Sequence, residues 1–267
     1  MKKFLFWFLA FIITCGAAVY QRMTGPTHPY HSHVQIENSD ISFKLPRSHE
    51  TEKDCEVRIP ADIEGIKGHL LYKRFKTSDD WTQIAMTQDE EGLIASLPHQ
   101  PAAGKLAYQV VLTYKEKDYP LTGKEPIVIR FKGHVPDYVL LPHILIMFLA
   151  MLFSTRAGIA ALDPKSNPRK LVLWTVGLLF AGGMILGPVV QHFAFGAFWT
   201  GIPFGTDLTD NKTLIAMIGW ILALIMGRKG KPARRWVLGA SALLLLIYLI
   251  PHSLLGSELD YSKVNRP

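Results

Sequence analysis

Five long apolar runs constrain this chain more than any other feature. They cover Phe4–Val19, Tyr138–Ala161, Leu171–Val190, Leu214–Gly227 and Trp236–Ile250. Their lengths bracket the roughly 20 residues that a helix needs to cross about 30 Å of hydrocarbon. We therefore expect a multidomain membrane protein, with an anchor helix at 1–22 and a four-helix transmembrane bundle at 136–256. The bundle spans are expected at about 138–161, 170–192, 211–227 and 235–254.

Basic residues gather in the connectors on one side of these runs. Lys2 and Lys3 precede the first run, and the later clusters are Arg156, Lys165, Arg169 and Lys170, then Arg228, Lys229, Lys231, Arg234 and Arg235. Cytoplasmic connectors carry such an excess of Lys and Arg, which explains the net charge of +7 without a nucleic-acid partner. The pattern predicts a multi-pass protein of the inner membrane, with 23–136 and a C-terminal tail at 257–267 extracytoplasmic.

The first apolar run also has features of an export signal. The stretch "MKKFLFWFLAFIITCGAA" has a charged start, an apolar core and a cysteine, Cys15, where a lipoprotein signal is cut. Because no small residue precedes Cys15, we expect an uncleaved anchor, while cleavage or lipidation stays open. Cys55 is the other of the two cysteines, so we expect neither a disulfide framework nor a cysteine metal site.

The polar middle of the chain has the rhythm of short β-strands. Apolar and polar residues alternate in "KLAYQVVLTYK", where Leu106, Tyr108, Val110 and Leu112 share one face. Similar runs are "CEVRIP", "KGHLLYKRF", "WTQIAM", "GLIASLP" and "PIVIRFKG", separated by turn-rich connectors. About seven strands in roughly 100 residues predict an exported antiparallel β-sandwich at 35–135.

The segments "HLLYKRFKTSDDWTQIAM" and "GLIASLPHQPAAGKLAYQVVLTY" resemble strand pairs of fibronectin type III and immunoglobulin-like domains. The resemblance covers about 35–133 and rests on strand rhythm and on the positions of Tyr72, Trp81, Pro98 and Tyr108. It implies a domain that binds or spaces, and we expect its partner to be another envelope protein. No Cys-Trp-Cys pattern supports an antibody-type domain.

A histidine-rich linker is expected at 23–34, before the sandwich. It contains His28, His31 and His33 in "THPYHSHVQ". Such tracts can hold zinc or copper, although a solvated loop explains the same residues. We favour the loop, because no carboxylate accompanies the three histidines.

The connector "VVQHFAFGAFWTGIPFGTDLTDNKT" is unusually aromatic and charged for a link between two spans. Phe193, Phe195, Phe198 and Trp199 suit the membrane interface, where aromatic rings are favoured. Thr209 or Asp210 can cap the next helix, and Lys212 can pair with Asp207 or Asp210. This interpretation needs no ligand.

A second hypothesis makes the same region a ligand site. His143, His192 and His252 all fall near the extracytoplasmic ends of their spans, and Asp207 and Asp210 add oxygen donors. The set suits a transition metal such as zinc, copper or iron, and two histidines alone could hold haem b. Histidines there also suit a proton relay at a quinone pocket.

No nucleotide-binding or hydrolase motif appears in the sequence. We expect an envelope component without catalytic activity, whose exported sandwich contacts a partner. The alternative is a redox or metal-handling subunit that uses the histidines.

Overall fold

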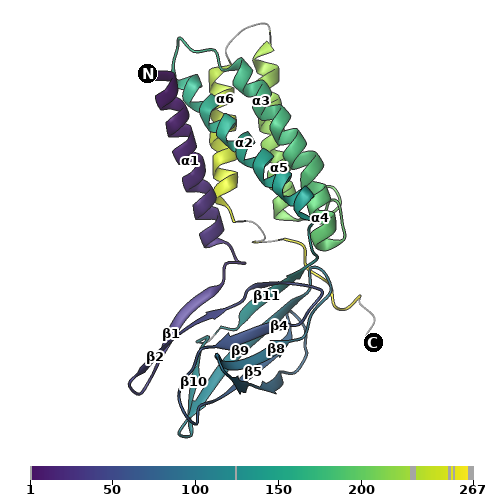
Figure 1. The fold of residues 1–267 in the computed structure, drawn as a ribbon. Helices are drawn as coiled ribbons and strands as arrows, with labels where there is room; N and C mark the ends of the chain where they lie inside the picture. The colour runs from purple at the N-terminus through teal and green to yellow at the C-terminus, as the bar shows by residue number, and fades with distance from the viewer. Residues whose placement is uncertain (1, 124, 229–232, 252–253, 255, 264–267) are drawn as a thin grey trace. The chain divides into compact units, whose positions relative to one another are not determined.

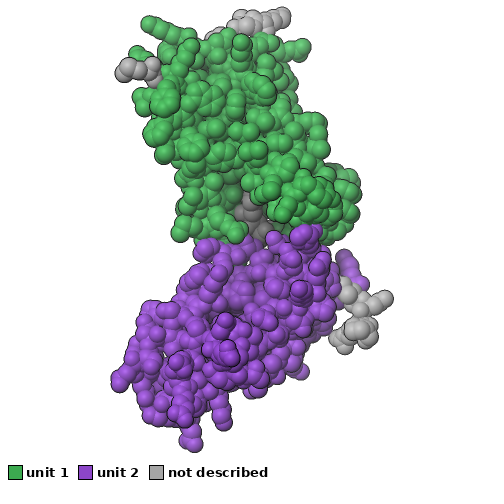
Figure 2. All heavy atoms as spheres, viewed as in Figure 1, with its two compact units in different colours: residues 1–26, 135–257 green, residues 27–134, 258–267 purple. Residues whose placement is uncertain are grey.

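The computed structural model describes residues 2–123, 125–228, 233–251, 254 and 256–263. The chain forms two units, which Figure 2 colours separately. Unit 1 comprises 1–26 and 135–257 and is helical. Unit 2 comprises 27–134 and 258–267 and is built from β-strands, so the end of the chain joins the β unit.

Unit 1 is a bundle of helices (Figure 1). Its elements are α1 (Lys2–Thr24), α2 (Asp137–Leu162), α3 (Arg169–Leu179), the π-helix η1 (Phe180–Leu186), α4 (Gly187–Phe195), α5 (Leu208–Met226) and α6 (Arg234–Leu249). Within the described residues, four helical segments are long and apolar enough to cross a membrane: α1, α2, the continuous α3–η1–α4, and α5. The length and apolar composition of these segments indicate a membrane protein. Helix α6 has 16 residues and a length of about 24 Å.

Small side chains line the core of the bundle. Ala150, Ala157, Ala216 and Ala223 are buried around Trp220, which is completely covered. Small residues let helices approach closely where lipid surrounds the outer faces. At Gly158, α6 lies close against α2, because an added Cβ would lie 2.4 Å from the Ser241 hydroxyl.

The third long segment contains a π-helical turn at η1. The backbone N–H of Gly187 bonds to the carbonyl of Gly182, five residues earlier. The same carbonyl accepts a hydrogen bond from His143 Nδ1 on α2 at 3.0 Å. π-Helical turns are rare insertions in α-helices, and this one gives α2 a polar contact with the third segment.

Unit 2 consists of three sheets. Its strands are β1 (Tyr30–Ile36), β2 (Ser39–Leu45), β3 (Ser48–Glu50), β4 (Cys55–Ile59), β5 (Lys67–Arg74), β6 (Thr82–Ala85), β7 (Thr87–Asp89), β8 (Gly92–Leu97), β9 (Lys105–Tyr114), β10 (Lys117–Pro120) and β11 (Ile127–Lys132). The largest sheet has the order β3-β11-β9-β5-β6, with β10 also paired to β9. A second has the order β4-β8-β7, and β1 and β2 form a hairpin. Among the described strands, β3 pairs with β11 in parallel and the other pairs are antiparallel.

All three sheets contribute to one hydrophobic core. The inward face of β9 contributes four completely buried side chains to this core, namely Leu106, Tyr108, Val110 and Leu112. This confirms the alternation in the sequence. The hairpin β1–β2 adds Phe43 and further apolar side chains to the core.

The structure adds to the expected elements at several points. His31 and His33 lie on β1, within the stretch expected as a linker. The hairpins β1–β2 and β9–β10 were not expected. Helix α5 begins at Leu208 rather than near Asn211.

Candidate functional site

A basic edge of unit 2 forms where β5 ends and β9 begins. Arg74 closes β5, and its guanidinium makes two parallel hydrogen bonds to Asp79, at 2.5 and 2.8 Å. Such bidentate pairing fixes the turn between them, which is further held by the Thr77 hydroxyl on the Arg74 carbonyl at 2.9 Å. The turn presents Lys76, whose side chain is largely exposed.

Lys105 lies beside this turn, at the first position of β9. Its carbonyl accepts the backbone N–H of Phe75 at 3.0 Å, which ties the turn to β9. In contrast to Lys76, its side chain is only 15% exposed. The edge therefore carries three cations, Arg74, Lys76 and Lys105, and one carboxylate, Asp79.

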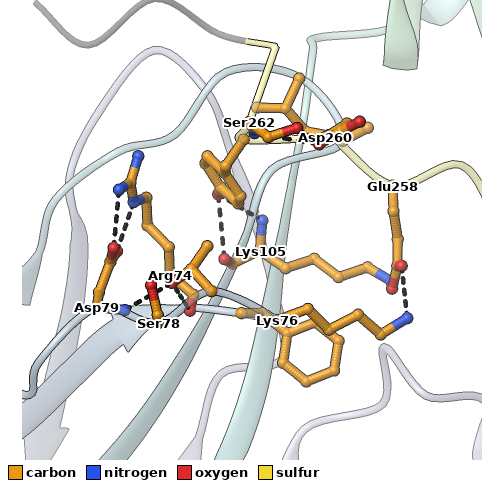
Figure 3. Close-up of a pocket in the computed structure, with 13 residues that line it drawn as sticks. Arg74, Lys76, Ser78, Asp79, Lys105, Glu258, Asp260 and Ser262 are labelled. Atoms are coloured by element: carbon orange, nitrogen blue, oxygen red, sulfur yellow. Dashed lines mark hydrogen bonds and ion pairs between the residues drawn. The ribbon is translucent and has the colours of Figure 1, made fainter.

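The C-terminal segment 258–262 lies across these cations. Glu258 accepts a hydrogen bond from Lys105 Nζ at 2.6 Å with one carboxylate oxygen and from Lys76 Nζ at 2.7 Å with the other. Figure 3 shows this carboxylate reaching the two ammonium groups. The backbone N–H of Leu259 adds a bond to the carbonyl of Ala103 at 3.1 Å. A single carboxylate thus satisfies two lysines of the β unit.

Tyr261 makes the second anchor of the segment. Its hydroxyl accepts the backbone N–H of Lys105 at 2.9 Å and donates to the side-chain oxygen of Gln100 at 3.0 Å. The Arg74 guanidinium lies 5.2 Å from the centre of the Tyr261 ring, within the range of a cation–π interaction. Glycine at position 104 leaves room for the Tyr261 hydroxyl, because a Cβ added there would lie 2.9 Å from that hydroxyl.

The electrostatics of the edge suit an anion. Burial lowers the pKa of the Lys105 ammonium, although its hydrogen bond to Glu258 favours the charged form. For Glu258, burial raises the pKa, but the hydrogen bonds from Lys105 and Lys76 outweigh it and the net pKa is lowered. A carboxylate is therefore held in its charged form at neutral pH. A partly buried lysine without such a partner would remain poorly compensated.

An open cavity of about 600 Å³ surrounds these groups. It is lined by the turn after β5, the start of β9 and the segment 258–262. We call it the cation pocket. Its donors can bind a carboxylate or another anion and can orient an aromatic ring.

In unit 1, the predicted site residue Asp207 is the N-cap of α5. Its carboxylate accepts the backbone N–H of Thr209 at 2.8 Å and of Asp210 at 3.4 Å. Its other oxygen accepts both the backbone N–H and the hydroxyl of Ser257, at 2.7 and 2.8 Å. The expected cap at Thr209 or Asp210 was wrong. The helix begins earlier, where Asp207 reaches its free amides.

Asp210 instead holds the aromatic connector against the start of α5. One oxygen of its carboxylate accepts the backbone N–H groups of Thr200 and Gly201, at 2.6 and 2.9 Å. Gly201 permits this approach, because an added Cβ would lie 2.6 Å from Asp210 Cβ. Lys212 was expected to pair with an aspartate, but its ammonium donates to the carbonyl of Ile250 at 3.0 Å, at the end of α6.

The predicted histidines have separate neighbours. His143 bonds to the Gly182 carbonyl at 3.0 Å. His192, on α4, stacks on Phe198 with ring centres 4.1 Å apart. His252 lies outside the described residues. Within the described part of the chain, no three His, Cys, Asp or Glu side chains gather as at a metal centre. The complete set of His143, His192, His252, Asp207 and Asp210, with its transition metal or haem b, stays a prediction.

Comparison of the chain with protein-family models, with curated proteins and with solved structures finds no match in any of the three.

The sequence analysis did not single out the cation pocket. Its cations are spread over "KRFK" at 73–76 and over Lys105, and its carboxylate lies some 150 residues further on, at Glu258. One signal for the pocket was present in the sequence, because the basic "KRFK" and the acidic "SELDY" at 257–261 carry charges of opposite sign. Neither stretch contains a motif with defined spacing.

Proposed function

We propose that this protein is a multi-pass component of the cell envelope that acts by binding, and that its β unit holds an anionic partner in the cation pocket. The observation that carries this proposal is that two lysines bind one carboxylate. The Nζ atoms of Lys105 and Lys76 lie 2.6 and 2.7 Å from the two carboxylate oxygens of Glu258. The groups around that carboxylate suit recognition of an acidic group.

The form of the pocket supports a chain segment as ligand. Its volume of about 600 Å³ lies in the range of ligand sites. It is open and polar, whereas sites for small apolar molecules are concave and mostly apolar. An extended segment can lie across such an edge and bond to its backbone, as Leu259 does with Ala103.

We further propose an immunoglobulin-like fold for the β unit. The order β4-β8-β7 corresponds to strands B, E and D of such domains, and β6-β5-β9-β11 corresponds to C′, C, F and G. The parallel pairing of β3 with β11 supports the assignment of β3 to an A′ strand. Cys55 on β4 has no cysteine partner on β9, so the disulfide of antibody domains is replaced by apolar packing.

The chain path supports five spans. Unit 2 contains residues from before α2 and from after α6. Both stretches lie on one side of the membrane only if the intervening helices cross it an even number of times. Helix α2, the α3–η1–α4 segment and α5 supply three crossings, so α6 makes the fourth. The basic connectors then favour an extracytoplasmic position for unit 2.

Site-specific photo-crosslinking in intact cells tests the binding function. A photoreactive residue at Thr77, in the pocket lining, should form a covalent adduct with an envelope protein. The same residue at Glu64, on an exposed turn of unit 2, is the matched control and should not. Lys76→Glu should abolish the adduct from Thr77. An adduct that is insensitive to Lys76→Glu, or the absence of any adduct from Thr77, would contradict the proposal.

A further inference from the structure

The segment 258–262 fills part of the cation pocket with groups that a partner would also have to supply. Glu258 provides a carboxylate to Lys76 and Lys105, and three residues later Tyr261 provides an aromatic ring to Arg74. Glu258 and Tyr261 each bind through the side chain. Between them, the backbone N–H of Leu259 bonds to the carbonyl of Ala103. The spacing Glu-x-x-Tyr therefore describes a ligand for this surface.

We infer that the C-terminal segment is a built-in ligand of the cation pocket, and that the partner is a protein segment with the same carboxylate and aromatic spacing, which must displace it. This inference rests on the proposed binding function, and it names the chemistry of the partner and a form of regulation. The partner can bind only after the segment 258–262, here called the tail, has left the pocket. The tail therefore raises the partner concentration that is needed for binding.

The contacts of the tail are suited to exchange. Lys76 is 65% exposed and Glu258 is 34% exposed, so their ion pair contributes less to stability than the pair of Glu258 with the mostly buried Lys105. The hydroxyl of Tyr261 bonds to the backbone of Lys105 and to Gln100, which an incoming tyrosine can do equally well. Nothing in this set requires the ligand to come from the same chain.

Tethering explains how weak contacts can still block the pocket. A segment on a short linker has an effective concentration of about millimolar at its own site. A partner segment with identical contacts must match this concentration before it occupies half of the pockets. A partner with one additional contact displaces the tail at a proportionately lower concentration.

The test uses the full-length protein in nanodiscs of neutral phosphatidylcholine. The probe is a fluorescent, blocked peptide with the sequence of residues 256–263, "GSELDYSK", and its binding is followed by anisotropy. We expect Glu258→Gln, and a second variant that ends at Ser257, each to bind the peptide at least tenfold more tightly than the wild type. Two tail variants are used because glutamine retains part of the hydrogen bonding.

Control variants define where the peptide binds. In the chain that ends at Ser257, Lys76→Ala should weaken peptide binding at least fivefold, whereas Lys117→Ala, at an exposed lysine of β10, should leave it unchanged. Peptides with glutamine in place of the glutamate, or alanine in place of the tyrosine, should each bind at least tenfold more weakly.

The outcomes separate this inference from the proposed function. The peptide could bind equally to the wild type and to both tail variants, and more weakly to the Lys76→Ala variant. This result would overturn the competition by the tail and would leave the pocket as a binding site for acidic segments. If no variant binds the peptide, the inference fails. The photo-crosslinks from Thr77 then decide the binding function independently.

Discussion

Two lysines of unlike surroundings hold Glu258. The side chain of Lys105 is mostly buried, so its charge needs a partner of opposite sign. The side chain of Lys76 is exposed and makes a weaker ion pair with the same carboxylate. Because the buried lysine loses most when the carboxylate leaves, we expect Lys105 to determine the strength of docking and Lys76 its specificity for charge.

The docking of the tail should depend on pH through Glu258. Its pKa in the docked state lies below the ordinary value of 4.5, so docking is stabilised above that value and weakens as the pH falls through the docked pKa. A nitroxide at Ser262→Cys should therefore be immobile at neutral pH and become mobile in acid, as measured by electron paramagnetic resonance. The label should be mobile at every pH in Glu258→Gln. Mobility that is independent of pH in the wild type would contradict this role of Glu258.

Gly92 is a position where unit 2 tolerates only glycine. Its φ is +126°, and an added Cβ would lie 2.2 Å from the carbonyl oxygen of Ile59. We expect Gly92→Ala to lower the free energy of unfolding by about 3 kcal/mol. Gly65 is the matched control. It also has positive φ, at +80°, but open space around it, so Gly65→Ala should lower it by about 1 kcal/mol.

Cys55 provides the measurement for these two variants. It is buried on β4, and burial raises the pKa of its thiol to about 12. In a Cys15→Ser chain, maleimide labelling of Cys55 during urea titration reports the opening of unit 2. Equal midpoints for Gly92→Ala and Gly65→Ala would show that the contact with Ile59 does not limit stability.

At the scale of elements, Asp207 joins the start of α5 to the chain after α6. Asp207→Ala removes the cap and the two bonds to Ser257, and should lower the stability of the bundle by about 1–2 kcal/mol. Asp207→Asn keeps an acceptor and should lower it by less than half as much. Thermal unfolding in detergent measures both. Equal midpoints for alanine and asparagine would indicate that capping contributes nothing.

Elements with regular apolar patterns could be predicted from the sequence. The buried face of β9 follows directly from the alternation of Leu106 to Leu112, since strand side chains alternate between faces. The long apolar runs likewise gave α1, α2, the α3–η1–α4 segment and α5. In both cases the pattern is local and repeats over many residues.

Elements that depend on uncommon turn residues could not be predicted. The hairpin β9–β10 turns at Lys115 and Glu116, both with positive φ, where such turns favour asparagine and glycine. The start of α5 was misplaced because several residues in "TDLTDN" can act as caps. The cation pocket depends on contacts between residues far apart in sequence, which no local pattern encodes.

For the whole molecule, the decisive issue is the side on which each unit lies. In a Cys15→Ser chain, Glu64→Cys and Ser262→Cys should react with a membrane-impermeant maleimide in right-side-out vesicles. Lys165→Cys, in the connector between α2 and α3, should react only after permeabilisation, because basic connectors stay in the cytoplasm. Protection of Ser262→Cys together with labelling of Glu64→Cys would show that α6 does not cross.

The π-helical turn of η1 has a consequence for how this chain can change by insertion and deletion. Seven residues, Phe180–Leu186, follow the wider π spacing. A π-helical turn accommodates one residue more than an α-helical turn, so loss of one of them can return the segment to α-helical spacing while the residues beyond it keep their faces. His192 would then stay beside Phe198, whereas the Gly182 carbonyl would lose the wider turn in which it receives both Gly187 and His143. One residue can therefore be lost from this stretch without turning the helix that follows it.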